Sequence, residues 1–202
     1  MSEVDAVILA GGFSSRAGTF KPALDLAGKS LLARCVEAFH GFCSSVIVVA
    51  GHEADRVETL VAAYPKVHLV RNAEYASGMF SSVRAGAAAV RTNRFFLTPG
   101  DHPFLREETC RLLLETAGKI VVPSFSGKAG HPVLLDSSLI PEILAEDAGS
   151  TLRDVLSRHE RTFVVVDDGG VLFDVDTIDD YRKAVEAFAA HDSKLSSFES
   201  PR

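Results

Sequence analysis

Residues 4–21, VDAVILAGGFSSRAGTFK, combine an apolar run with a glycine-rich polar loop and are the most informative part of the chain. Residues 4–10 form a short apolar run, which predicts a buried strand. The run stops at Gly11 and Gly12, and the loop that follows contains two serines, an arginine and a lysine. In open α/β sheets, ligands bind at the carboxyl ends of the strands. A strand that leads directly into a glycine-rich, polar loop therefore predicts an α/β protein whose first loop binds a ligand.

The loop over residues 11–21 has the chemistry of a phosphate site. Its glycines let the backbone approach phosphate oxygens, and successive N–H groups can form an anion-binding nest. Arg16 can direct two donors onto phosphate oxygens, and Lys21 adds a compact charge. An ordinary turn between a strand and a helix would not need Ser14 together with Arg16 and Lys21. The loop therefore predicts a site for a triphosphate.

The spacing of the glycines excludes two other phosphate loops. A dinucleotide-binding fingerprint needs G-x-G-x-x-G, whereas Gly11 and Gly12 are adjacent. A P-loop needs G-x-x-x-x-G-K-[ST], and Gly28-Lys29-Ser30 supplies only the end of that pattern, because Ala23 stands at the first glycine position. We interpret Gly28 and Lys29 as a turn that precedes a helix.

Composition limits the class of protein. A chain of 202 residues, 47% of them hydrophobic, fits one globular domain with a sizeable core. The net charge of −6 argues against a general nucleic-acid surface. The sequence has no long apolar stretch and no signal-peptide layout, so we expect no membrane association and a cytoplasmic location. Cys35, Cys43 and Cys110 lack metal-ligand spacing and are expected to be buried, reduced thiols.

Apolar runs alternate with amphipathic stretches along the chain. This alternation predicts a single three-layer, Rossmann-like α/β domain over residues 1–190, with a mostly parallel twisted sheet. Residues 191–202 are expected to form a disordered tail. The expected strands are 4–10, 46–50, 67–70, 95–97, 120–122 and 163–166, and the expected helices are 31–40, 54–63, 81–90, 107–116, 150–158 and 178–189. Residues 123–132 are expected to form a loop or hairpin beside the ligand site, Ser150 or Gly149 to open one helix, and Thr177 to cap the last helix.

Two acidic segments follow apolar runs. Asp101 lies after the strand 95–97 and after Gly100, where its carboxylate is well placed to bind Mg²⁺. Asp174 and Asp176 follow the apolar residues 171–173, and strand alternation sends both to one face. Asp176 is the better metal ligand of the two, with Asp174 as a second ligand or a supporting residue. The alternatives are a turn aspartate at 101 and a helix cap with solvated acids at 174–176.

Two further segments leave a strand and carry polar groups. In residues 72–83, the Ser82 hydroxyl and the backbone at Gly78 can contact a base, a ribose or an acceptor. The simpler interpretation of this segment is helix capping by Ser77 and core packing by Met79. In residues 127–135, His131 can hydrogen-bond an acceptor phosphate or orient a metal ligand, or it can be structural. His102 is expected to be orienting or exposed.

These segments together resemble one family. The first loop matches L-A-G-G-x-S-x-R-x-G-x-x-K, a pattern similar to that of the MobA-like and MocA-like nucleotidyltransferases of the molybdenum cofactor. The later segments resemble the family's N-x-x-Y-x-x-G-M-x-x-S, G-D-x-P, G-H-P-V-L and D-x-D-T-x-x-D motifs. The resemblance spans residues 5–188, and its one visible departure is Ala17, where the family usually has methionine.

The resemblance implies a fold, a reaction and a set of site residues. The fold is the nucleotide-diphospho-sugar transferase type. The reaction is Mg²⁺-dependent transfer of a nucleoside monophosphate from GTP or CTP to a phosphorylated acceptor, molybdopterin, with release of pyrophosphate. Molybdoenzymes would be partners. The implied catalytic residues are Arg16, Lys21 and Asp101; the nucleotide-binding residues are Leu9, Ala10, Gly11, Gly12, Ser14, Arg16, Lys21, Gly51, Asn72, Gly78, Ser82 and Gly100; the metal ligands are Asp101 and Asp176; and the acceptor-binding residues are His131 and Ser82.

Three alternatives stay open at this point. By resemblance, Leu9-Ala10-Gly11-Gly12 favours the guanylyl branch, whereas Gly130-His131-Pro132 favours the cytidylyl branch. A sugar- or polyol-phosphate nucleotidyltransferase would use the same chemistry on another acceptor. A non-catalytic nucleotide-binding accessory protein for molybdoenzyme maturation is the third reading.

Overall fold

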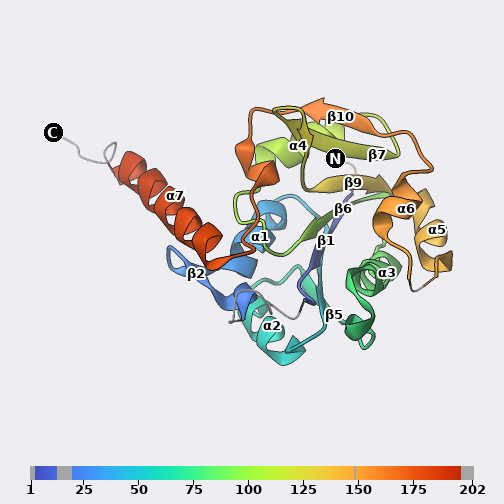
Figure 1. The fold of residues 1–202 in the computed structure, drawn as a ribbon, viewed down its shortest axis with the longest axis horizontal. Helices are drawn as coiled ribbons and strands as arrows, with labels where there is room; N and C mark the ends of the chain where they lie inside the picture. The colour runs from blue at the N-terminus through green and yellow to red at the C-terminus, as the bar shows by residue number, and fades with distance from the viewer. Residues whose placement is uncertain (1–2, 13–19, 148, 197–202) are drawn as a thin grey trace.

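The computed structural model describes residues 3–12, 20–147 and 149–196. Within them, a central eight-stranded sheet has the order β10-β7-β9-β6-β1-β4-β5, and β8 pairs with β7 (Figure 1). The strands are β1 (Asp5–Leu9), β4 (Ser45–Ala50), β5 (Val67–Arg71), β6 (Arg94–Pro99), β7 (Ile120–Phe125), β8 (Lys128–Ala129), β9 (Val133–Asp136) and β10 (Thr162–Val165). The run from β6 to β5 is parallel, and β10 is parallel to β7. The prediction of a mostly parallel sheet is confirmed.

Helices cover both faces of this sheet, as predicted. On one face lie α1 (Leu31–His40), α2 (Ala54–Val61) and α4 (Glu107–Glu115), and on the other lie α3 (Met79–Ala89), α5 (Ile140–Ala145) and α6 (Leu152–Leu156) (Figure 1). Each layer buries its own hydrophobic cluster against the sheet. The molecule is therefore a three-layer α/β domain.

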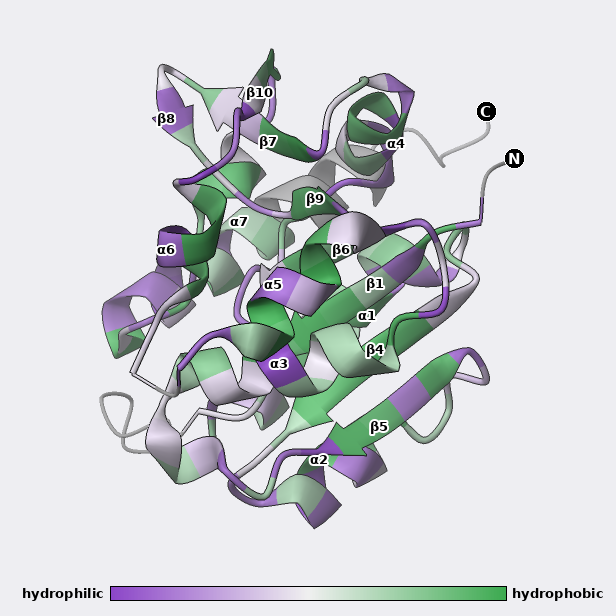
Figure 2. Ribbon diagram, turned by 90° about the vertical axis from the view of Figure 1, so that its right-hand side faces the viewer, coloured by the Kyte–Doolittle hydropathy of each residue, from purple (hydrophilic) through white to green (hydrophobic). Residues whose placement is uncertain are grey.

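Alternation along the strands divides the core between the two layers. In β1, Ala6 and Ile8 join the cluster under α1, whereas Val7 joins the cluster under α3. The same division recurs in β4, where Val48 and Val49 face opposite layers. Since both faces are covered, these strands are apolar along most of their length, as Figure 2 shows for β1 and β4.

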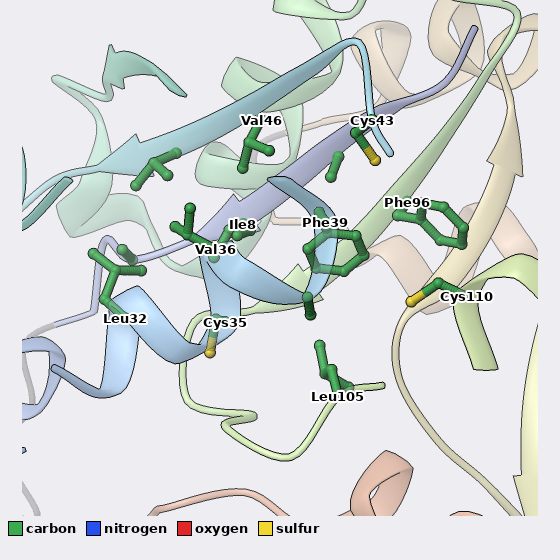
Figure 3. Packing of buried hydrophobic residues seen from close by; sticks show 14 of the residues in the cluster. Ile8, Leu32, Cys35, Val36, Phe39, Cys43, Val46, Phe96, Leu105 and Cys110 are labelled. Atoms are coloured by element: carbon green, nitrogen blue, oxygen red, sulfur yellow. The ribbon is translucent and has the colours of Figure 1, made fainter. Parts of the chain in front are cut away.

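The core under α1 contains the three cysteines, which are free thiols and buried, as predicted (Figure 3). In the same cluster the Phe39 and Phe96 rings lie 5.5 Å apart between centroids. Burial raises the pKa of the Cys43 thiol to about 12, so that thiol stays protonated at neutral pH.

Two regions between residues 120 and 177 differ from the prediction. Residues 133–136 form β9, which was not expected and which lies antiparallel between β6 and β7. The hairpin alternative for 123–132 is correct: β7 turns through Ser126 and Gly127, both at positive φ, into β8. Residues 171–173, expected to end a strand, are not extended: residues 171 and 172 belong to the 3₁₀ helix η4 (Gly169–Leu172), and Phe173 is its C-terminal cap. The Asp168 side chain caps the other end of η4, where it accepts from Gly170 N.

Side-chain hydrogen bonds set the first residues of helices α6 and α7. Helix α6 begins at Leu152 rather than at 150, because Thr151 and Asp154 form a capping box. Thr177 caps α7 (Ile178–Ser196), as predicted: its hydroxyl accepts from Asp180 N. This helix continues past residue 189 to Ser196, and the rest of the expected tail, 197–202, lies outside the described residues. Its outer end projects from the body of the molecule (Figure 1).

A short hairpin joins the first loop to α1. Strands β2 (Asp25–Leu26) and β3 (Lys29–Ser30) are connected by a turn at Ala27 and Gly28, and Ser30 caps α1. The prediction of a turn rather than a P-loop at Gly28 and Lys29 is confirmed. Among the described residues, none of the helices is long and apolar enough to cross a membrane.

Candidate active site

The site lies along the carboxyl edge of the parallel strands. Strands β6, β1, β4 and β5 are neighbours in that order, and each is followed by a segment that carries predicted site residues. Asp101 follows β6, Gly11 follows β1, Gly51 follows β4 and Asn72 follows β5. Because neighbouring strands are about 4.8 Å apart, these positions form a row across the edge.

Two cavities open on this row and meet at two carboxylates. The first, about 380 Å³, is lined by Leu9, Ala10, Gly11, Gly12, Lys21, Pro22, Leu31, Tyr75, Ala76, Gly78, Met79, Ser82, Pro99, Gly100, Asp101 and Asp176. The second, about 300 Å³, lies toward β9 and is lined by Met79, Pro99, Asp101, His102, Ala129, Gly130, His131, Val171, Leu172, Asp174 and Asp176. Asp101 and Asp176 belong to both linings, so they stand at the junction between the cavities.

Lys21 connects the two carboxylates at this junction. Its Nζ donates to Asp101 Oδ2 at 3.2 Å, to Asp176 Oδ1 at 3.0 Å and to the Val175 carbonyl at 2.9 Å. Burial alone would lower the pKa of Lys21, but the hydrogen bonds and charges of Asp176 and Asp101 raise that pKa above its ordinary value. The side chain is therefore a fixed cation between the cavities at any physiological pH.

The junction has the donors that a divalent metal needs. Both carboxylates reach one cation, Lys21 Nζ, so they can also converge on a metal ion. No group of three or more metal-ligating side chains occurs among the described residues, so the remaining ligands would be substrate phosphates and water, as is usual for Mg²⁺. Asp174 lines only the second cavity. Burial, with the negative charges of Asp176 and Asp101, raises the pKa of Asp174.

Two residues predicted to touch the nucleotide lie behind the cavity wall instead. Asn72 is buried and donates from Nδ2 to Ser82 Oγ, which does line the first cavity. Gly51 has no room for a side chain, because a Cβ there would lie 2.3 Å from Tyr75 Cβ and 3.0 Å from the Gly11 carbonyl oxygen. Both residues therefore position the lining rather than form it.

The prediction that Met79 packs in the core is wrong. Its side chain is 68% exposed and lines both cavities. Helix α3 begins at Met79 and buries Phe80 and Val83 against the sheet, which turns Met79 toward the cleft. Its N-terminal cap is Gly78, with a φ of 104°, and not Ser77.

Sequence reasoning missed the apolar part of the first cavity's lining. Pro22, Leu31, Tyr75 and Ala76 contribute to it, and none of the four was among the predicted site residues. The one available signal was the spacing of Phe80, Val83 and Ala87, which marks the buried face of α3 and leaves Met79 outside it.

A pair of histidines forms the far side of the second cavity. The His102 and His131 rings lie 4.8 Å apart between centroids, and among the described residues neither Nδ1 atom has a hydrogen-bond partner. Burial lowers the pKa of each ring to about 4, so both are neutral at pH 7. His102 is buried, so the expectation of an exposed side chain is wrong. The His131 peptide N–H donates to the Val171 carbonyl, and the peptide bond to Pro132 is cis.

The predicted site residues Ser14 and Arg16 lie outside the described residues. The other predicted residues that line a cavity are Leu9, Ala10, Gly11, Gly12, Lys21, Gly78, Ser82, Gly100, Asp101, His131 and Asp176. The structure thus brings together side chains that are distant in the sequence: Lys21 and Asp176, which are hydrogen-bonded, are 155 positions apart.

These features define a three-layer α/β protein with a site of two adjoining cavities at the carboxyl ends of its parallel strands. The chain belongs to the MobA-like NTP transferase domain family, whose model matches residues 6–162.

Relatives of known name support this assignment. The chain is 30% identical to a molybdenum cofactor cytidylyltransferase of Escherichia coli K12, over 93% of this chain and 98% of that protein. It is also 30% identical to a nicotine blue oxidoreductase of Paenarthrobacter nicotinovorans, over 87% and 93%. The solved structure of Rv0371c from Mycobacterium tuberculosis H37Rv superposes with a TM-score of 0.79, 27% identity and coverage of 92% and 98%, and another structure of that protein is a manganese complex, with a TM-score of 0.74.

Proposed function

We propose that the protein transfers CMP from CTP to the terminal phosphate of a molybdopterin-type acceptor, with Mg²⁺, and releases pyrophosphate. The observation that carries the proposal is the junction itself: Lys21, Asp101 and Asp176 lie where two cavities meet. A transferase for two phosphorylated substrates needs one cavity for each substrate and cationic groups between them.

The order of the strands suggests how the two substrates lie. The first cavity extends from Asp101, after β6, past Gly11, after β1, toward Ser82 on the side of β4 and β5. The base would lie at the Ser82 end and the α-phosphate at Asp101. The acceptor would enter from the second cavity, beside His131. The loop at 11–21 would contact the β- and γ-phosphates through its backbone and through Arg16.

The reaction requires positioning and charge neutralisation rather than an enzyme nucleophile. An oxygen of the acceptor phosphate attacks the α-phosphorus, the bond from that phosphorus to the α–β bridging oxygen breaks, and pyrophosphate leaves with the electron pair. A phosphate is anionic at pH 7, so no general base is needed. Mg²⁺, when bound by Asp101 and Asp176, would neutralise charge on the α-phosphate. Lys21 would neutralise the developing charge on the leaving group.

Two choices within the proposal rest on relatives. The name of the Escherichia coli relative favours CTP over GTP. The manganese complex of Rv0371c supports a divalent cation in this fold, and the proposed cation is Mg²⁺. Delivery of the product to a molybdoenzyme in the cytoplasm completes the proposed role.

The test is turnover with purified protein, molybdopterin and each of the four common ribonucleoside triphosphates in the presence of Mg²⁺. We expect pyrophosphate release that depends on both CTP and molybdopterin. The name of the second relative raises oxidoreductase chemistry, so oxidation of a reduced nicotinamide or flavin is followed in parallel. If pyrophosphate is released only when a sugar phosphate is present, the acceptor is a sugar phosphate and not molybdopterin. Electron transfer without pyrophosphate would contradict the proposal.

A further inference from the structure

Strand β10 leaves one edge of the central sheet open. The sheet order ends at β10, which pairs with β7 on one side, and no strand within residues 3–12, 20–147 and 149–196 pairs with its other side (Figure 1). The Val166 N–H donates to the Ser124 carbonyl of β7, so the even-numbered residues of this segment direct their backbone groups toward β7. Because backbone groups alternate in direction along a strand, those of Phe163 and Val165 point to the open edge.

The side chains of this edge strand are apolar and exposed. Phe163 is 51% exposed and Val165 is 83% exposed, and both lie on the same face of β10 because they are two residues apart. At the opposite edge of the sheet, Arg71 of β5 forms ion pairs with Asp55 and Glu58. Charged side chains protect an exposed edge from pairing with another chain, and β10 contains none. The open edge of β10 is therefore suited to pairing with another strand.

Opposite charges lie on the two sides of this apolar pair. Arg161 directly precedes β10, and Asp167 follows it by two residues. Both are exposed, and neither forms an ion pair with another residue in the part of the chain that the structure describes. The Arg161 guanidinium lies 5.7 Å from the centroid of the Phe163 ring, so it stays beside the edge. A strand with a cation before it and an anion after it is complementary to an antiparallel copy of itself.

We propose that two copies of this chain form a symmetric dimer by antiparallel pairing of their β10 strands. The two-fold axis passes at Val164, which places Phe163 opposite Val165 of the second copy and Arg161 opposite Asp167 of the second copy. The edge-facing backbone groups of Phe163 and Val165 then exchange ladder hydrogen bonds across the axis. An aromatic side chain opposite a β-branched one, and a cation opposite an anion, are both favourable cross-strand pairs.

Backbone direction and charge together select this register. A shift by one residue would set edge-facing backbone groups against groups that already pair with β7. A shift by two residues would place Arg161 opposite Val165 in one direction and Phe163 opposite Asp167 in the other, so a charge would face an apolar side chain. This self-complementarity favours a second copy over a strand of a different protein.

The dimer joins two sheets into one and leaves both sites open, because neither Phe163 nor Val165 lines a cavity. The inference does not depend on the proposed function. Sedimentation equilibrium of the full chain over a range of concentrations should show a dimer with a micromolar dissociation constant. Val165→Lys should weaken that dimer about tenfold or more, because it sets a charge opposite Phe163. The control is Val185→Lys, which changes an exposed apolar side chain on α7 and should leave the dissociation constant unchanged.

Exchange of the two charges tests the register itself. Arg161→Glu and Asp167→Lys should each weaken the dimer about tenfold, because each sets like charges opposite one another. The double variant restores opposite charges and should return to within about threefold of the wild-type constant. Circular dichroism checks that each variant is folded. A double variant as weak as the single ones, or an unchanged constant in Val165→Lys, overturns the proposal. A wild type that stays monomeric also overturns it and leaves the edge to a strand of another protein.

Discussion

Lys21 holds close together two carboxylates that would otherwise repel each other. Its ammonium group lies 3.0 and 3.2 Å from Asp176 and Asp101. We expect Lys21→Met to weaken triphosphate binding by about ten- to a hundredfold, since a charge-assisted contact contributes about 1.5–3 kcal/mol. Calorimetry with CTP measures the change. The control is Lys29→Met, since the exposed Lys29 pairs with the half-buried Glu37 outside both cavities. Equal affinity in the wild type and in Lys21→Met would remove Lys21 from the site.

Substitution of each aspartate separately distinguishes the metal ligands. Asp101→Asn and Asp176→Asn keep the shape and remove the charge at the junction, so both should keep the fold and lose more than a hundredfold in Mg²⁺-dependent turnover. Asp174→Asn should lose much less of that turnover, because Asp174 lines only the second cavity and not the junction. Turnover against Mg²⁺ concentration, with circular dichroism for folding, gives the comparison. A larger effect at Asp174 than at Asp176 would reverse the assignment.

The buried histidines predict an acid-sensitive fold. The pKa of His131 falls from 6.5 to about 4 on burial, and that of His102 does the same. Between pH 4 and pH 6.5, both imidazoles are mostly protonated in the unfolded chain and mostly neutral in the folded chain. The free energy of unfolding should therefore be highest above pH 6.5 and decrease toward pH 4, by up to about 1.4 kcal/mol per pH unit for each histidine. His131→Asn should make this decrease shallower in urea unfolding between pH 4.5 and 7.5. An unchanged slope would show that His131 titrates normally in the folded protein.

At the scale of secondary-structure elements, the approach of α3 to the sheet depends on Gly86. A Cβ at that position would lie 2.4 Å from Val7 Cγ1. Alanine improves helix propensity by about 1 kcal/mol, but overpacking against a buried strand costs about 1–3 kcal/mol. We expect Gly86→Ala to destabilise the protein by about 1 kcal/mol in denaturant unfolding. In a Val7→Ala background, which removes the nearest obstructing methyl group and leaves Val49 Cγ2 at 3.0 Å, the same change should destabilise the protein less. Destabilisation of equal size in both backgrounds would contradict this packing.

Elements with a local signal were predictable, and those made by distant partners were not. Strands β1, β4 and β6 have helices on both faces, so each appears in the sequence as an uninterrupted apolar run. Strand β9 is short, and it exists because Leu134 pairs with Phe96 and Val121, residues that are distant in the sequence. Helix α6 begins two residues after Ser150 because a side-chain pair, rather than composition, closes its first turn.

At the scale of the whole molecule, the strand order gives the site its layout. The sequence was sufficient to predict that Gly11, Asp101 and His131 would lie along one edge of the sheet, because each follows a strand or lies in a loop beside one. It was not sufficient to predict two separate cavities, because their walls combine Leu31, Tyr75, Met79 and Val171 from three distant segments. The roles of Asn72 and Gly51 as supporting residues also depend on such packing.

The proposed reaction breaks the bond between the α-phosphorus and the oxygen that bridges it to the β-phosphate, at the junction of the two cavities. The test uses CTP labelled with ³²P at either the α- or the γ-phosphate. The labelled CTP is incubated with the protein, molybdopterin and Mg²⁺, and the product that carries the label is identified. We predict that the α label moves to the acceptor, that the γ label moves to pyrophosphate, and that Asp101→Asn abolishes both. Recovery of the γ label as inorganic phosphate, or no transfer of the α label to any acceptor, would contradict the account.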